Sequence, residues 1–191
     1  MKLPGSLSDD PKRAPGHLAV LEEFINTLQL DTGVDQLGDT EQAEAWFREY
    51  GLLGVHERVT EGELDLAHEF RQALRALLLA NNGAELDEGA VESLGRVLGT
   101  TPVSLGVAAD GTLKLLPSGT GLTRALGEMQ AVVYEAMQQG TWQRFKACAS
   151  DTCRWAFYDH SRNRSRTWCS MEVCGNRHKV RAHRQRTTAQ A

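Results

Sequence analysis

The sequence predicts a mainly α protein with a small β-hairpin, made of a helical domain and a C-terminal module built on four cysteines. Five stretches between residues 17 and 139 place apolar side chains three or four positions apart, which is typical of helices that bury one face. One segment between the fourth and fifth stretches alternates instead and indicates a hairpin. All four cysteines lie within the 27 residues from Cys148 to Cys174. A chain of 191 residues, 41% of them apolar, can form one helical core and a small appended module.

The first two helices follow a proline-containing leader. Residues 1–15 show no apolar periodicity, so we expect them to form a loose segment. The first helix begins at about His17, and its buried face is expected to carry Leu18, Leu21, Phe24, Ile25 and Leu28. Asp39 or Thr40 can cap the second helix. The inward face of that helix is expected to carry Ala43, Trp46, Phe47 and Tyr50.

The third and fourth helices have clear start and stop signals. The capping box Thr60-Glu-Gly-Glu63 opens the third and longest helix, and Asn81-Asn82-Gly83 is expected to end it. Its core stripe consists of Leu64, Ala67, Phe70, Ala73, Leu74, Leu77 and Leu78. The fourth helix is expected from Asp87 to Gly99, with a buried face formed by Ala90, Val91, Leu94 and Leu98.

The hairpin and the last helix complete the predicted helical domain. Apolar residues alternate over 103–107 and again over 113–115, and Ala109-Asp110-Gly111 between them can form the turn. The last helix, over about 120–139, is expected to bury Leu122, Leu126, Met129, Val133 and Met137. Gly140 then marks the junction between a helical domain, residues 16–140, and a C-terminal module, residues 141–191. Residues 1–140 hold all five apolar stripes, so we expect them to fold alone.

The cysteines follow the spacing Cys-x4-Cys-x15-Cys-x4-Cys, which is typical of a metal site. Two close pairs let two local turns each supply half of a tetrahedral thiolate shell around one zinc ion per chain. The predicted ligands are Cys148, Cys153, Cys169 and Cys174. Four protein ligands leave no position for water or substrate, so this zinc is expected to be structural. Disulfides, free thiols and an iron–sulfur cluster are the alternatives, and the N-terminus shows no secretion signal that would favour disulfides.

The module also contains a short aromatic strand, Trp155-Ala-Phe-Tyr158. So small a module has few residues from which to build a core, so Trp155, Phe157 and Trp168 are expected to be structural. Tyr158 is the ring that we leave open for stacking on a nucleic-acid base.

Charge divides the chain into an acidic body and a basic end. Residues 144–186 contain eleven Lys or Arg and three acidic residues, a balance of +8, whereas the rest contains ten basic and 22 acidic residues, a balance of −12. Such a concentration of positive charge on a small module is self-repulsive unless a polyanion neutralises it. The asymmetry therefore predicts a polyanionic partner at the C-terminal end.

The basic residues form two groups. No helix breaker follows Cys174, and a helix there would place Arg177, Arg181 and Arg184 on one face and Lys179 on an adjacent one. Val173 and Val180 are expected to mark the side of this helix that packs. Arg162, Arg164 and Arg166 alternate in the loop before the third cysteine. The predicted nucleic-acid contacts are Arg162, Arg164, Arg166, Arg177, Lys179, Arg181 and Arg184.

The run from Cys148 to Arg177 contains both cysteine pairs, the segment Phe157-Tyr-Asp159 and the signature Cys174-Gly-Asn-Arg177. It resembles the bacterial CGNR zinc finger. The preceding part, which includes Phe24-Ile-Asn-Thr27 and Arg71-Gln-Ala-Leu-Arg75, is similar in layout to the ABATE domain that precedes this finger in stress-induced transcriptional regulators. The resemblance implies DNA binding and points to a ligand site for a small-molecule, anionic effector at Asn26, Arg71 and Arg75.

These three side chains also have structural interpretations. Asn26 can form a capping or interhelical hydrogen bond, because buried amides are usually satisfied locally. Arg71 and Arg75 can pair with acidic neighbours such as Glu69.

Our first hypothesis is a zinc-containing transcriptional regulator that binds double-stranded DNA, with a helical domain for sensing or assembly. RNA binding is one alternative, and an adaptor that docks its basic module on an acidic partner is another. We find no Ser-His-Asp grouping, phosphate-binding glycine loop or paired carboxylates, so we expect no enzyme. No apolar run is long enough to cross a bilayer, so we expect a soluble cytoplasmic protein, associated with the nucleoid if it binds DNA.

Overall fold

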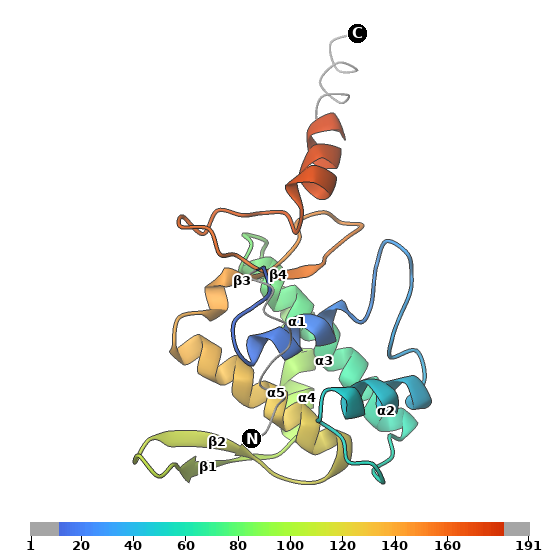
Figure 1. The fold of residues 1–191 in the computed structure, drawn as a ribbon, viewed down its shortest axis with the longest axis vertical. Coiled ribbons are helices and arrows are strands. Elements are labelled where there is room, and N and C mark those ends of the chain that lie inside the picture. Colours follow the sequence, from blue (N-terminus) through green and yellow to red (C-terminus); the bar gives the residue numbers. More distant parts are fainter. Residues whose placement is uncertain (1–11, 182–191) are drawn as a thin grey trace.

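The computed structural model describes residues 12–181, and it has a mainly helical body with the basic helix projecting from one end (Figure 1). The helices are α1 (Leu18–Asn26), α2 (Thr40–Glu49), α3 (Glu61–Ala80), α4 (Glu88–Thr100) and α5 (Gly121–Gln138). Two antiparallel pairs join β1 (Val103–Val107) to β2 (Leu113–Pro117) and β3 (Phe145–Ala147) to β4 (Ala156–Tyr158). The 3-10 turn η1 (Trp142–Arg144) precedes β3, and the π-helical turn η2 (Met171–Gly175) leads into helical residues 176–181. The predicted fold class is confirmed.

Three helices begin where the sequence predicts. The side chain of Asp39 accepts a hydrogen bond from the first turn of α2, and the side chain of Asp87 does the same for α4. At α3, Thr60 and Glu63 form the predicted reciprocal capping box. Among the described residues, no helix combines the length and the apolar character needed to cross a membrane.

Helix α3 is the element against which most of the chain packs, since it contacts α1, α2, α4, α5 and β3. The predicted inward faces of α1, α2 and α3 meet in one core, where the rings of Phe24, Phe47 and Phe70 are fully buried. Phe24 lies 6.0 Å from both Phe47 and Phe70, measured between ring centroids. The periodic apolar stripes therefore converge on a central aromatic cluster.

The predicted buried face of α4 is wrong. Val97 is the buried side chain of this helix, whereas Val91 and Leu98 are 45% and 47% exposed. Of the predicted face, Leu94 packs partly buried against the core and Ala90 is half-buried. The side of α4 that carries Val91 and Leu98 is left to solvent, so the covered stripe is narrower than predicted and includes Val97. Met137, expected to be buried near the end of α5, is also exposed.

The core does not stop at the predicted junction at Gly140. Phe145 and Ala147 of β3, together with Ala156 and Tyr158 of β4, are buried in the same hydrophobic cluster as α1, α3 and α5. A chain that ended at Gly140 would expose the faces of α1 and α3 that these strands cover. This continuity argues against the expectation that residues 1–140 fold alone.

An ion pair between a buried arginine and a half-buried aspartate holds the long loop between α1 and α2. Arg71 on α3 is 2% exposed, and its two terminal nitrogens each donate to a different carboxylate oxygen of Asp35 at 2.6 Å. Arg71 also donates to the hydroxyl of Thr27, where the loop begins. Burial raises the pKa of Asp35, but the hydrogen bonds from Arg71 and from the Leu37 amide, together with the charge of Arg71, lower it below the ordinary value of 3.8. The pair therefore stabilises the fold above that pH, and the stabilisation is lost as the pH falls and Asp35 is protonated.

We predict that Asp35→Ala lowers the free energy of unfolding at neutral pH by about 3 kcal/mol, because it leaves a buried guanidinium without its counter-ion. Denaturant titrations of both proteins would measure the difference. Asp31→Ala, an exposed position on the same loop, is the matched control and should change little. Equal stability of the Asp35→Ala variant and the parent would show that the pair does not stabilise the loop.

Candidate metal centre and basic surface

The first cysteine pair lies on a tight turn at the end of β3. The amide of Cys148 donates to the carbonyl of Trp155 at 2.8 Å, which continues the pairing of β3 with β4. The chain then reverses, and the amides of Cys153 and Arg154 both donate to the carbonyl of Ser150 at 3.0 and 3.1 Å. Arg154 has a φ of 51°, in the left-handed region that such a reversal requires. The turn brings the Cys153 thiol back toward Cys148.

In the second pair, Cys174 lies on the π-helical turn η2, and Cys169 lies just before the residue that caps this turn. Ser170 caps this turn, and its carbonyl accepts from the amides of Cys174 and Gly175 at 3.0 and 3.1 Å. A Cβ atom at Gly175 would lie 2.5 Å from the Met171 sulfur and 3.3 Å from Cδ1 of Trp168. A larger residue here would push aside the end of the half-exposed Met171 side chain and crowd the Trp168 ring, so the glycine of the Cys-Gly-Asn-Arg signature lets these two side chains lie close to the backbone beside Cys174.

The four thiols converge on one point. Cys153 Sγ lies 3.6 Å from Cys169 Sγ, Cys169 Sγ lies 3.8 Å from Cys174 Sγ, and all four sulfurs lie within 4.8 Å of one another. A tetrahedral ion with zinc–sulfur bonds of about 2.3 Å requires sulfur separations of about 3.8 Å. A disulfide would require about 2 Å. The geometry therefore fits four ligands to one structural zinc ion, as the spacing predicts.

The surroundings of the thiols also fit a cation. Phe157 and Trp168 pack against the cluster, and Cys148 and Cys174 are buried. Hydrogen bonds with Cys148 raise the pKa of Cys153 to about 12 and raise that of Cys169 as well. The protein alone thus opposes four adjacent negative charges, and a divalent cation supplies the charge that lets all four thiols bind as thiolates.

Three asparagines of the helical body hold the backbone of the finger. Asn26 at the end of α1 forms two hydrogen bonds with Ala156 of β4, as donor to its carbonyl at 3.0 Å and as acceptor from its amide at 2.8 Å. The Asn81 amide donates to the carbonyls of Trp142 and Phe145 at 2.9 Å each. These bonds fix η1, β3 and β4 against the ends of α1 and α3.

Asn82 joins the two halves of the metal centre. Its side-chain amide donates at 2.8 Å to the carbonyls of both Ala147 and Thr167. Ala147 immediately precedes Cys148, and Thr167 lies two residues before Cys169. The sequence predicted Asn81-Asn82-Gly83 only as a helix stop and missed this role. Two adjacent asparagines at the end of a helix were the feature of the sequence that could have indicated this role.

A buried ion pair supports the loop between the two cysteine pairs. Lys146 of β3 donates to the Asp159 carboxylate at 2.8 Å, and both residues are buried. Burial raises the pKa of Asp159, but hydrogen bonds from Lys146, Ser161 and Arg166 lower it to about 2. Asp159 belongs to the Phe157-Tyr-Asp159 segment, and the sequence alone did not predict this structural role.

The three predicted loop arginines have different environments. Arg166 donates to the carbonyls of Trp168 and Cys169, and its guanidinium lies 4.7 Å from the centroid of the Phe157 ring. It therefore positions the backbone of the third ligand. Arg162 and Arg164 are exposed, and the φ of 52° at Arg164 marks a sharp turn of the loop.

The aromatic strand differs from the expectation at Trp155 and answers the question left open at Tyr158. Trp155, expected in the core, is 37% exposed, because it lies just before β4 and outside the cluster. Tyr158, left open as a stacking ring, is 6% exposed and packs beside the His160 ring at 4.8 Å. Phe157 and Trp168 pack against the thiols as predicted.

The helix after the fourth ligand carries an exposed basic surface. Figure 1 shows it extending from the finger away from the body. Arg177, Lys179 and Arg181 are all exposed, and none forms an ion pair with the residues that the structure describes. Val173 and Val180, expected to pack, are 47% and 50% exposed. Arg184 lies outside the described residues.

The residues proposed for an effector are engaged within the protein. The amide of Asn26 bonds Ala156, and Arg71 pairs with Asp35. Arg75 donates to the carbonyls of Ile25 and Leu28, and burial lowers its pKa to about 10. Glu69, expected as a partner of these arginines, instead pairs with Arg96. The three side chains therefore hold α1 and its following loop on α3 and the finger.

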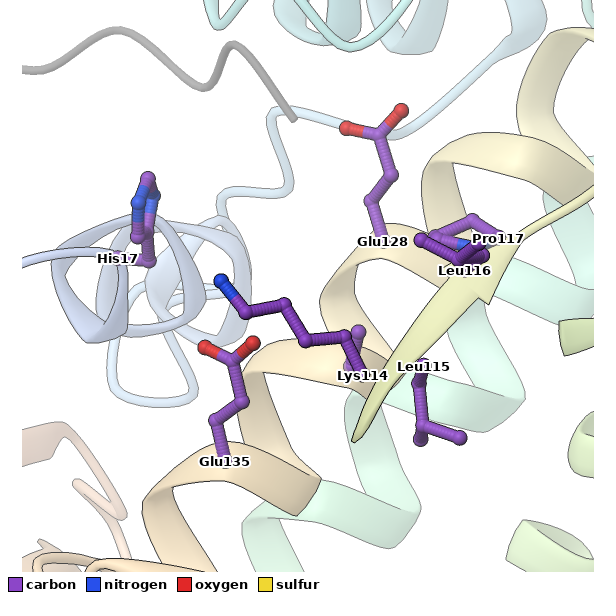
Figure 2. A pocket seen from close by; sticks show the side chains of 8 residues that line it. His17, Lys114, Leu115, Leu116, Pro117, Glu128 and Glu135 are labelled. Carbon is purple, nitrogen blue, oxygen red and sulfur yellow. The ribbon is translucent and has the colours of Figure 1, made fainter. Parts of the chain in front are cut away.

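An open groove lies elsewhere, between the start of α1, β2 and α5. It has a volume of about 440 Å³, and its apolar lining includes Leu116 and Ala131. Figure 2 shows Lys114 of β2 and Glu135 of α5 pointing toward the same part of the groove, with His17 facing them from the other side. The groove is large enough for a small molecule. It does not adjoin the four thiols.

Two family models match the chain. The model described as CGNR zinc finger matches residues 144–187, which include all four thiols. The ABATE model, described as "Putative stress-induced transcription regulator", matches residues 16–138. No curated protein matches the sequence.

We predict that the purified protein contains one zinc ion per chain and that Cys174→Ser abolishes this stoichiometry. Structural zinc contributes on the order of 10 kcal/mol to the folding of such a module, so the variant should lose the order of residues 145–175. Elemental analysis and hydrogen exchange would measure the two effects. Full zinc content in Cys174→Ser would exclude the predicted ligand set.

We predict that Asn82→Ala accelerates the release of zinc to a chelator, because it removes the two hydrogen bonds that join the halves of the metal centre. Asn81→Ala is the matched control, since its two bonds lie farther from the ligands. Each variant should lose about 1–3 kcal/mol of stability. Equal release rates from the two variants at equal stability would refute a specific role for Asn82.

Proposed function

Since the chain belongs to the ABATE family and ends in a CGNR zinc finger, we propose that it is a transcriptional regulator that binds double-stranded DNA. The observation that carries the proposal is the exposed basic helix that follows the fourth zinc ligand. Arg177 and Arg181 lie one turn apart on this helix, and Lys179 lies between them. An isolated helix of comparable size fits the major groove of B-DNA, where arginine and lysine bind phosphates or guanine edges.

In this proposal zinc serves to hold the first turn of the basic helix in place. A helix of a few turns is marginal in water unless something fixes its first turn. Cys174 ties the first turn of this helix to the metal, and the His178 ring packs on Trp168 at 4.8 Å between centroids. The metal would thus present the basic side chains as an ordered surface. The exposed Arg162 and Arg164 would add phosphate contacts beside the helix.

Duplex DNA is favoured over single-stranded RNA by the placement of the aromatic rings. Recognition of single strands commonly uses exposed rings on which bases stack. Phe157 and Tyr158 are buried, and Trp155 is the partly exposed ring of the strand. A basic helix on a finger with few exposed rings is better suited to phosphates and groove edges than to unstacked bases.

We predict a strong salt dependence of DNA binding. Five contacts, from Arg162, Arg164, Arg177, Lys179 and Arg181, would give a slope of about −4 to −5 for log affinity against log salt. Arg177→Ala or Arg181→Ala should weaken binding more than Lys179→Ala and reduce the slope by about one. Titrations on specific and random duplexes at several salt concentrations would measure this.

Lys114→Ala is the matched control, because Lys114 is an exposed cation on β2, at the opposite end of the molecule in Figure 1. It should leave affinity unchanged. Tighter binding to structured RNA than to duplex DNA would favour the RNA alternative. A flat salt response would remove nucleic acid from the proposal.

A further inference from the structure

The β1–β2 hairpin exposes apolar side chains that nothing in the described chain covers. Its base packs on α5, where a Cβ atom at Gly127 would lie 3.3 Å from Pro117 and 3.5 Å from Val103. Farther along the same face, the register pairs Val107 with Leu113. Leu105, Val107 and Leu113 are 63%, 71% and 63% exposed. Figure 1 shows this part of the hairpin extending beyond the helices.

The outer edge of β1 pairs with no strand among residues 12–181. The amide of Ala108 donates to Thr112, and the amide of Ser118 donates to Pro102. Since hydrogen-bonded pairs alternate along an antiparallel ladder, Ser104 and Gly106 bond with β2. The amides and carbonyls of Val103, Leu105 and Val107 therefore point outward. Two strands are marginally stable in water without a helix or a further strand against them. The outer part of this hairpin has neither among the described residues, so its edge is suited to a further strand.

The edge also lacks the charges that usually protect edge strands from pairing. Strand β1 contains no charged residue, and between Thr101 and Ser118 the charged residues are Asp110 and Lys114, which cancel. The chain outside residues 144–186 carries a balance of −12. Two copies would therefore repel each other across most of the acidic body, and the hairpin is a neutral place at which they can meet.

We propose that β1 pairs with β1 of a second copy of this chain, antiparallel and centred on Leu105. Each outward amide then meets an outward carbonyl, because Leu105 faces its equivalent and Val103 faces Val107 of the other copy. The two hairpins form one four-stranded sheet. A two-fold axis makes this edge complementary to itself, so a second copy fits it without any further partner.

The proposed interface is independent of DNA binding. In Figure 1 the hairpin and the basic helix lie at opposite ends of the molecule. Dimerisation through β1 would leave both basic helices accessible, and it should survive Arg177→Ala. Dimerisation would then be a function of the helical domain, for which the sequence predicted either sensing or assembly.

Sedimentation equilibrium of the full chain tests the proposal. We expect twice the chain mass of 21.1 kDa at high concentration and dissociation on dilution. Leu105→Lys places a charge on the two-fold axis and should raise the dimer dissociation constant by about tenfold or more. Val55→Lys is the matched control, since Val55 is 75% exposed and lies outside the hairpin, and it should dimerise like the parent.

Hydrogen exchange of the unmodified protein gives a second measurement. The amides of Val103, Leu105 and Val107 should become protected as the concentration rises through the dissociation constant. A monomer at every concentration up to the solubility limit would overturn the proposal. A dimer that persists in Leu105→Lys and leaves these amides unprotected would place the interface elsewhere. Protection at all concentrations in a monomer would show that another part of the chain covers the edge.

Discussion

The convergence of four thiols on one zinc ion is the constraint on which the C-terminal part of the structure depends. The two cysteine pairs lie on separate turns, and the sulfurs of Cys153 and Cys169, one from each pair, come within 3.6 Å. Thiols this close cannot all ionise without a cation, because each negative charge disfavours the next. Zinc thus links the turn after β3 to the turn that begins the basic helix, and it does so with few residues of core.

The helical body is built to receive this centre. Asn26, Asn81 and Asn82 reach from the ends of α1 and α3 to the backbone of the finger, and the core continues through β3 and β4. Side-chain amides are suited to this task because they donate to carbonyls that face away from any ladder. The finger and the body are consequently one packed unit. A change in the packing of α1 or α3 would therefore alter the positions of the zinc ligands.

The sequence predicted the features that depend on local spacing. The caps of α2, α3 and α4, the hairpin and the four ligands follow from periodicity, turn residues and cysteine spacing, which act over short stretches of chain. It failed where burial depends on distant partners. Val91 and Leu98 have the pattern of a buried face, yet α4 packs along a narrower stripe. Tyr158 has the character of a binding residue, yet its strand is covered by the body.

The residues predicted to bind an effector also show that sequence spacing does not identify partners that are distant in the chain. Arg71 and Arg75 are a pair of cations one turn apart, and their spacing alone suits an anion as well as it suits a carboxylate or carbonyl within the fold. The partner of Arg71 is Asp35, which lies 36 residues away in sequence and becomes a neighbour only when the loop after α1 folds back. The partners of Arg75 are the carbonyls of Ile25 and Leu28 at the end of α1.

The exposed basic helix raises the question of what keeps it ordered. Residues 176–181 extend from the finger, and the two valines expected to anchor their helix are half exposed. A segment this short does not hold a helical conformation by itself, because nucleation costs more than a few hydrogen bonds return. Its order must therefore come from Cys174 in the metal shell, from Gly175 packed on Met171 and Trp168, and from His178 on Trp168.

Loss of zinc would consequently disorder the proposed DNA-binding surface while leaving the number of its positive charges unchanged. The apo protein would then bind DNA as a flexible polycation, with salt dependence but without sequence preference, so a comparison of the two states separates the contribution of order from that of charge.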